Sequence, residues 1–180
     1  MNFQSVRRSL YVVALCATAA VVAGCATASK PEAMVPVTLD TGIKHAQTAS
    51  VVVAGGQETS ALGKSQISND AFQQAITQAI EKNKTFSRVV KGAGGDYVLA
   101  VTVVSMDQPS FGLSFTVKME AAWSLKKADG SVVMQETIKS EGTAGMGEAF
   151  AGVERMRLAN EAAARNNIAA GLQKIGRLQF

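Results

Sequence analysis

One stretch decides the fold of this chain: FGLSFTVKMEAAWSL, residues 111–125. Its odd-numbered positions are all apolar, whereas its even-numbered positions are small, polar or charged. Successive side chains of a β-strand point to opposite faces of the sheet, so this alternation predicts one long strand with a buried face and a wet face. We therefore expect the odd positions from Phe111 to Leu125 to face the core.

Strands are also predicted on both sides of this stretch. The hairpin signal Ala128-Asp129-Gly130 follows it, so Ser131 to Thr143 should return as the next strand. Before it, Asp96 to Met106 forms a strand that ends at the turn Asp107–Ser110. One-sided alternation with hairpin connections is typical of an antiparallel sheet that is covered on one face only.

The first part of the chain adds a strand and a helix. Residues 49–54 are apolar and β-branched and precede two glycines, which predicts a buried strand. A shorter apolar pattern at residues 35–39 predicts an edge strand. Ser68 and Asp70 then suit a helix N-terminus. They are followed by an apolar stripe at helical spacing, Phe72, Ala75, Ile76, Ala79 and Ile80, and the helix should end near residues 82–84.

A second, longer helix is predicted from Gly147 to Arg177. At 100° per residue its apolar line includes Phe150, Val153 and Ile168. The order of elements is then β-α-β-β-β-α. The predicted fold class is α+β, an antiparallel sheet of four to five strands with two helices packed on one face.

The N-terminus carries a secretory signal. Arg7 and Arg8 precede an uncharged apolar run from Leu10 to Val22. A helix of that length rises about 20 Å, which is short of the ~30 Å hydrocarbon core of a bilayer. A basic start, a short apolar segment and small residues after it predict a signal peptide. The pair Arg7-Arg8 matches the twin-arginine export signal only in part, so the general secretory route is the preferred alternative.

The end of this signal resembles the bacterial lipobox. In Val22-Ala23-Gly24-Cys25, an aliphatic residue and two small residues precede a cysteine. The resemblance implies cleavage between Gly24 and Cys25 and acylation of Cys25, with the membrane as a partner through the lipid. Two or more acyl chains hold a protein stably on a bilayer. Ala26, in place of Asp, resembles the sorting signal for the periplasmic face of the outer membrane.

The chain then divides into a signal peptide (residues 1–24), an acylated cysteine with a flexible tether (25–36) and a single α+β domain (37–180). Removal of the signal takes away Arg7 and Arg8 and lowers the formal net charge of +4 by two. This mild charge does not favour a nucleic-acid partner. Cys16 leaves with the signal, so the domain has no thiol for a disulfide or a metal.

Two segments carry a family resemblance. Residues 107–113 (DQPSFGL) and 152–161 (GVERMRLANE) resemble a family of small uncharacterised proteobacterial outer-membrane lipoproteins, over roughly residues 51–178. The resemblance implies relatives but no activity. Some members carry a label as sugar-nucleotide acyltransferases, a class that resembles a β-helix of hexapeptide repeats. Nothing in this chain repeats with a period of six, so we set that activity aside.

Candidate catalytic and metal-binding residues do not form a recognisable site. The only histidine, His45, lies in a polar stretch with no nearby acid, which is typical of a solvated loop. The glycines at 142, 145 and 147 are spaced in the reverse of the dinucleotide fingerprint, and no lysine follows as in a phosphate loop. We therefore predict no catalytic residue, no metal and no cofactor.

Asn160 and Asn167 fall inside the apolar line of the last helix, with Arg157 beside them. Buried amides need hydrogen-bond partners. They are either structural amides bonded to a strand or loop, or a polar notch beneath a groove that holds a ligand or a partner segment.

Two classes of function remain open. The first is a non-enzymatic envelope lipoprotein with a binding, assembly or accessory role, which displays its sheet or its helix groove to another envelope protein. The second is an enzyme or carrier that acts on a lipid or glycan precursor. The residues favour the first class. The oligomeric state does not follow from the sequence.

Overall fold

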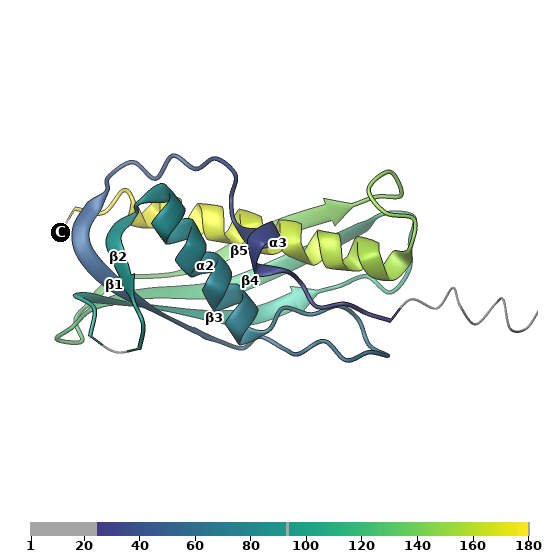
Figure 1. The fold of residues 1–180 in the computed structure, drawn as a ribbon, viewed down its shortest axis with the longest axis horizontal. Helices are drawn as coiled ribbons and strands as arrows, with labels where there is room; N and C mark the ends of the chain where they lie inside the picture. Colours follow the sequence, from purple (N-terminus) through teal and green to yellow (C-terminus); the bar gives the residue numbers. More distant parts are fainter. Residues whose placement is uncertain (1–24, 93, 180) are drawn as a thin grey trace, which may run out of the picture.

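A computed structural model describes residues 25–92 and 94–179 of the chain. The predicted signal peptide, with Gly24 at its cleavage site, lies outside the described residues. Within them, five strands form one sheet in the order β2-β1-β3-β4-β5, and the helices α2 and α3 lie side by side over one face of it (Figure 1). The predicted α+β class, with both helices on one face of the sheet, is confirmed.

The elements follow one another in the predicted order, with one short strand added after the first helix. They are η2 (Pro31–Met34), β1 (His45–Ala54), α2 (Asn69–Asn83), β2 (Phe86–Val90), β3 (Tyr97–Asp107), β4 (Phe115–Lys127), β5 (Val132–Ala144) and α3 (Gly152–Ile175). The additional strand, β2, lies at one edge of the sheet, and β5 lies at the other.

The sheet is mixed, and the prediction of a purely antiparallel sheet was wrong. β3, β4 and β5 pair antiparallel, but β1 runs parallel to both β2 and β3. The cause is α2, which carries the chain back along the sheet before the next strand begins. A helical crossover of this kind joins parallel strands, whereas a hairpin joins antiparallel ones.

The alternation in β4 is confirmed from Phe115 onward. The odd positions from Phe115 to Leu125 are all buried, and Trp123 is fully buried. Phe111 and Leu113 were predicted to face the core, but they are exposed and precede the strand. The first residue of β4, Phe115, pairs with Ala144, the last residue of β5. The alternation therefore continues in the sequence beyond the point where the neighbouring strand ends.

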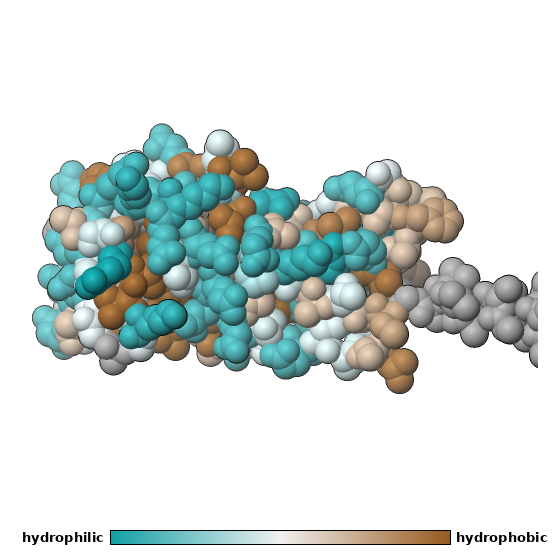
Figure 2. Space-filling view, viewed as in Figure 1, coloured by the Kyte–Doolittle hydropathy of each residue, from teal (hydrophilic) through white to brown (hydrophobic). Residues whose placement is uncertain are grey.

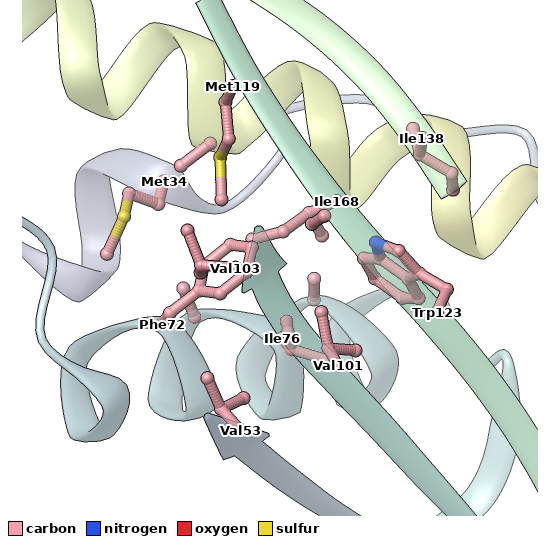
Figure 3. Close-up of a cluster of buried hydrophobic side chains, with 14 of the residues drawn as sticks. Met34, Val53, Phe72, Ile76, Val101, Val103, Met119, Trp123, Ile138 and Ile168 are labelled. Carbon is pink, nitrogen blue, oxygen red and sulfur yellow. The ribbon is translucent and has the colours of Figure 1, made fainter. Parts of the chain in front are cut away.

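α2 packs as its periodicity predicts. All five apolar positions of its stripe are buried, and the Ser68 side chain caps the helix by accepting a hydrogen bond from the Ala71 N–H. Figure 3 shows Phe72 and Ile76 of α2 pointing toward Val103 and Val101 of β3, with Ile168 of α3 beside them. The core thus lies between the two helices and the covered face of the sheet.

The segment predicted to be a flexible tether is packed on the domain. Residues 31–34 form the short helix η2, and Met34 is fully buried beside α2 and α3 (Figure 3). The Arg165 guanidinium donates to the Ala33 carbonyl, at 2.8 Å. The edge strand predicted at residues 35–39 does not form. A buried methionine and a charged hydrogen bond hold this segment in place, and neither can be recognised from its Pro-rich composition.

α3 begins later than predicted, at Gly152, and Phe150 is exposed in the loop before it. The helix approaches the sheet closely at two glycines. A Cβ atom on Gly142 of β5 would lie 2.1 Å from the Ala163 backbone nitrogen, and one on Gly171 of α3 would lie 2.6 Å from the Trp123 ring. Gly142, the first glycine of the G-x-x-G-x-G pattern, is therefore required for packing.

Candidate functional site

Cys25, the predicted lipidation site, is exposed and is the first described residue. The next residue is already held by the domain, because the Ala26 N–H donates to the Ala61 carbonyl at 3.2 Å. The Ser65 hydroxyl donates to the Thr27 carbonyl at 2.7 Å. The described chain thus starts against the β1–α2 connection, at the right-hand end of the molecule in Figure 1.

Three connections meet at this end, which we call the anchor end: residues 55–68, 108–114 and 145–151. The Lys64 ammonium donates to the Gln108 carbonyl at 3.1 Å and to the Ser110 hydroxyl at 3.3 Å, which joins the first connection to the second. The opposite end of the sheet, which we call the hairpin end, contains the β4–β5 turn.

Arg155 joins the second connection to the third. Its guanidinium donates to the Phe150 carbonyl at 2.6 Å and to the Gly112 carbonyl at 3.3 Å. It also lies over the Phe115 ring, at 5.2 Å from the ring centroid. The side chain of Arg155 is buried, so this residue fixes the backbone of both loops from below. The burial of Arg155 follows from the loops around it.

The asparagines of the predicted polar notch are bonded within the domain. Asn167 accepts a hydrogen bond from the Trp123 indole at 2.9 Å, and its amide donates to the Ile138 carbonyl at 3.0 Å. Asn160 accepts from the Gln108 amide at 2.8 Å and donates to the Ser65 carbonyl at 2.8 Å. Each is fully buried, and its hydrogen bonds tie α3 to a strand or to the anchor-end loops.

Arg157, the third notch residue, is bonded to acids on its own helix. Its guanidinium contacts the carboxylates of Glu154 and Glu161. The Arg157 side chain lowers the pKa of Glu154, and the Glu154 carboxylate raises the pKa of Arg157. Glu161, which is also buried, accepts a hydrogen bond from the Lys30 backbone N–H at 2.8 Å. The charged group therefore holds the N-terminal segment onto α3.

His45 is buried in β1, and its placement in a solvated loop was wrong. Its Nε2 donates to the Ile175 carbonyl at 3.1 Å, and its ring lies 5.4 Å from the Phe86 ring. These partners come from the end of α3 and from the short strand β2, neither of which can be read from the polar residues around His45.

Glu120 pairs with Lys139 across the uncovered face, at 3.6 Å. Glu136 contacts Lys174 of α3 instead. A surface groove of about 510 Å³ lies between α2 and β2; it is open and lined mainly by polar side chains, among them Gln74 and Thr77.

Two kinds of feature are absent from the part of the chain that the structure describes. No three His, Cys, Asp or Glu residues in that part gather closely enough to bind a metal ion. No helix in residues 25–92 and 94–179 has the length and the hydropathy that spanning a membrane requires.

No protein-family model matches the chain, and no curated protein sequence matches it. Its fold is similar to that of a Xanthomonas campestris protein of the family DUF330, with a TM-score of 0.64 at 16% identity over 83% of this chain and 94% of that one. It is also similar to a hypothetical protein from Chlamydia trachomatis, with a TM-score of 0.52 at 10% identity over 73% and 98% of the two chains.

A third similar structure is the PelC dodecamer from Paraburkholderia phytofirmans, with a TM-score of 0.50 at 16% identity over 79% and 95% of the two chains. At these identities the likenesses show a shared fold. The family resemblance predicted from the sequence is confirmed to that extent.

Proposed function

We propose that this protein is a periplasm-facing lipoprotein that is held on a membrane by acyl chains on Cys25 and has a non-enzymatic binding or assembly role in the cell envelope. The observation that carries the proposal is the place of Cys25, at the end of the lipobox-like tetrapeptide and directly before a residue that the domain holds. Because so little free chain separates the lipid from the domain, the anchor end faces the bilayer.

A binding role is supported by the use of the buried polar residues. Asn160 and Asn167 form hydrogen bonds that join α3 to the loops and the sheet, and Arg157 pairs with Glu161, which accepts from the N-terminal segment. These groups stabilise the fold, since a buried polar group without a partner costs about 1–3 kcal/mol. The surface therefore offers the stronger candidates for function.

The uncovered face of the sheet is the surface best suited to a partner. Val52, Ala100 and Ser124 lie side by side across β1, β3 and β4, and Thr102 lies beside Ala122 in the next row. These short side chains make a flat surface, whereas the charged pairs Lys118–Glu141 and Glu120–Lys139 lie toward one end of it. The centre of a protein interface is depleted of charge in the same way.

The edges of the sheet are less suited to strand addition. Along β5, the Asn166 and Asn167 amides of α3 donate to the carbonyls of Glu141 and Ile138. At the other edge, β2 has five residues. Short or covered edges protect a sheet from pairing with another chain.

We propose a second copy of this chain as the partner on the uncovered face. PelC from Paraburkholderia phytofirmans, a protein of similar fold, forms a dodecamer. A lipid anchor also favours self-assembly, because it holds the copies in the plane of one membrane and so raises their effective concentration.

The anchor is tested by a Cys25→Ser variant in the native host. The unchanged protein should incorporate a palmitate analogue, and density-gradient fractions should contain it together with outer-membrane porins, as Ala26 implies. The variant should take up no label and remain as precursor or as a released form. Label on the Ser variant would contradict lipidation, and recovery with inner-membrane markers would contradict the sorting assignment.

The assembly is tested by cross-linking in envelopes, with the masses of the products measured. The unchanged protein should give a ladder of multiples of its own mass. Thr102→Arg places a charge in the centre of the uncovered face and should abolish the ladder. The matched control Gln74→Arg adds the same charge to the exposed side of α2 and should keep it. A product that contains a different protein, or monomers alone, would contradict self-assembly.

A further inference from the structure

The anchor end carries exposed apolar side chains on all three of its connections. Leu62 is 101% exposed, Phe111 is 88% exposed, Phe150 is 84% exposed and Leu113 is 75% exposed, and Met146 is about half-exposed. Single exposed apolar residues are ordinary on protein surfaces, but several at one place mark an interaction site. Figure 2 shows apolar residues gathered at the end where the described chain begins.

These side chains are held together by contacts beneath them. Lys64, two residues from Leu62, is bonded to Gln108 and Ser110 just before Phe111. Arg155 is bonded to the carbonyls of Gly112 and Phe150. Backbone carbonyls of these loops are thus bonded to Lys64 and Arg155, whereas the apolar side chains of the loops are exposed.

Cys25 lies at the same end, one residue before the hydrogen bond between Ala26 and Ala61. Ala61 is the direct neighbour of Leu62. A lipid on Cys25 would therefore bring Leu62 to the bilayer surface, and the contacts of Lys64 and Arg155 would bring the other two connections with it. The sequence placed Phe111, Leu113 and Phe150 in the core, so the apolar anchor end follows from the structure alone.

We propose that the anchor end docks on the lipid bilayer, with Leu62, Phe111, Leu113 and Phe150 inserted among the lipids beside the acyl chains of Cys25. This inference rests on the acylation proposed above. Burial of these side chains in the apolar layer is favourable for the same reason as burial in a protein core. The domain then stands upright, since β4 runs from the anchor end to the hairpin end.

An upright domain has a consequence for assembly. The uncovered face of the sheet is then roughly perpendicular to the membrane. A neighbouring copy that is anchored in the same membrane can therefore approach this face from the side. The hairpin end, at the far end of the 13 residues of β4, lies about 40 Å from the bilayer at 3.3 Å per residue.

The test uses the acylated protein with a single added cysteine. The lipid blocks the thiol of Cys25, so a thiol-reactive label attaches only to the added cysteine. Leu62→Cys and Phe150→Cys place the thiol at the anchor end, and Val132→Cys is the matched control at the hairpin end, where Val132 is also exposed. Each thiol receives an environment-sensitive fluorophore. The proteins are reconstituted in vesicles of phosphatidylethanolamine and phosphatidylglycerol, with and without lipids that carry a nitroxide quencher on the acyl chain.

We expect the labels at 62 and 150 to shift to shorter emission wavelengths and to be quenched several-fold more strongly by the nitroxide lipid than the label at 132. Equal and weak quenching at all three positions, in protein whose mass confirms acylation, would overturn the docking and leave the proposed function intact. Labels that are shielded from an aqueous quencher but not reached by the nitroxide lipid would mean a protein cover, which also overturns it. Protein without acyl chains would overturn the proposed function instead.

Discussion

The two faces of the sheet differ most clearly along β4, where neighbouring residues belong to opposite faces. Phe115, Trp123 and Leu125 point under the helices and are buried, whereas Thr116 and Lys118 point to the uncovered face and are exposed. The covered face is built from large side chains, with a glycine at the point in β5 where α3 comes closest. The uncovered face is built from small side chains at its centre and ion pairs toward one end.

This difference shows how each face is constrained. On the covered face the volume of each side chain must match the helix that packs above it. Gly142 and Trp123 therefore both suit their positions, although they differ greatly in size. On the uncovered face no element of residues 25–92 and 94–179 packs above the strands, and the small residues there do not contribute to the core. Substitutions that are paired across the two faces therefore test both the fold and the proposed partner surface.

The largest contrast is expected between Ala121→Arg and Ala122→Arg. Ala121 is fully buried under the helices, so arginine there would bury an unpaired charge and overfill the core. We expect a loss of about 5 kcal/mol or more, enough to unfold the domain. Ala122 faces the uncovered side, where the cost should stay within about 1 kcal/mol. Circular dichroism and denaturant melts measure both, and a folded Ala121→Arg protein would break the comparison.

Trp123 and Ser124 give the next contrast. Trp123→Ala should cost about 3–5 kcal/mol of unfolding free energy through the cavity that it leaves. Trp123→Phe should keep most of the packing but leave the Asn167 oxygen without its indole donor, at about 1–3 kcal/mol. Ser124→Ala, on the uncovered face, should change stability by no more than about 0.5 kcal/mol. A Phe variant as stable as the unchanged protein would show that the Asn167 hydrogen bond contributes nothing.

Phe115 and Thr116 test the register at the start of the strand. Phe115→Ala should destabilise the domain by about 3 kcal/mol, at the low end for a buried aromatic, and it also removes the ring beneath Arg155. Thr116→Ala should cost about 0.5 kcal/mol, because its hydrogen bond to Thr143 is exposed. Equal losses in urea melts would mean that both faces are buried, as in a tight assembly, and a larger loss at Thr116 would contradict the register.

The smallest effect on stability is expected at Asp96, which directly precedes β3 and belongs to neither face of the sheet. The backbone N–H and the hydroxyl of Thr48 donate to Asp96 and lower the pKa of this carboxyl below its usual 3.8. The ionised Asp96 therefore stabilises the folded domain at pH values above the pKa that this carboxyl has in the unfolded chain. This contribution is lost as the pH falls through the lower pKa that it has in the folded domain. Melting temperatures measured from about pH 5 to pH 2 should fall less steeply for Asp96→Asn than for the unchanged protein. Thr48→Val, which keeps the N–H donor, should show an intermediate slope, and identical slopes would contradict the role of Asp96.

Local patterns predicted the elements that are long and covered on one face. The stripe of α2 and the alternation from Phe115 to Leu125 were confirmed, because each depends on the burial of one face along many residues. The strand β2 was missed, since its five residues carry no periodicity, and its pairing with β1 depends on a parallel crossover. The mixed sheet was missed for a related reason: the alternation shows which face is buried but not the direction of the neighbouring strand.

The candidate site was predicted unevenly. Asn160 and Asn167 were recognised as amides inside an apolar stripe, and the partners that make them structural come from Trp123 and from the anchor-end loops. His45 was placed in solvent because residues that contact it in space, Phe86 and Ile175 among them, are 41 and 130 residues away in the sequence. The exposed Phe111 and Leu113 were placed in the core because alternation does not mark where a partner strand stops.

The sequence by itself determined the α+β class and the faces of α2 and β4 that are buried, and it predicts a secretory signal that ends at Cys25. Each of these depends on composition or on spacing within a short segment. The tertiary structure alone decided which strands run parallel, how residues 26–36 pack onto the domain, and which apolar residues are exposed at the anchor end. Those features come from contacts between segments far apart in the chain, and the free energy of such contacts depends on the fold that brings the segments together.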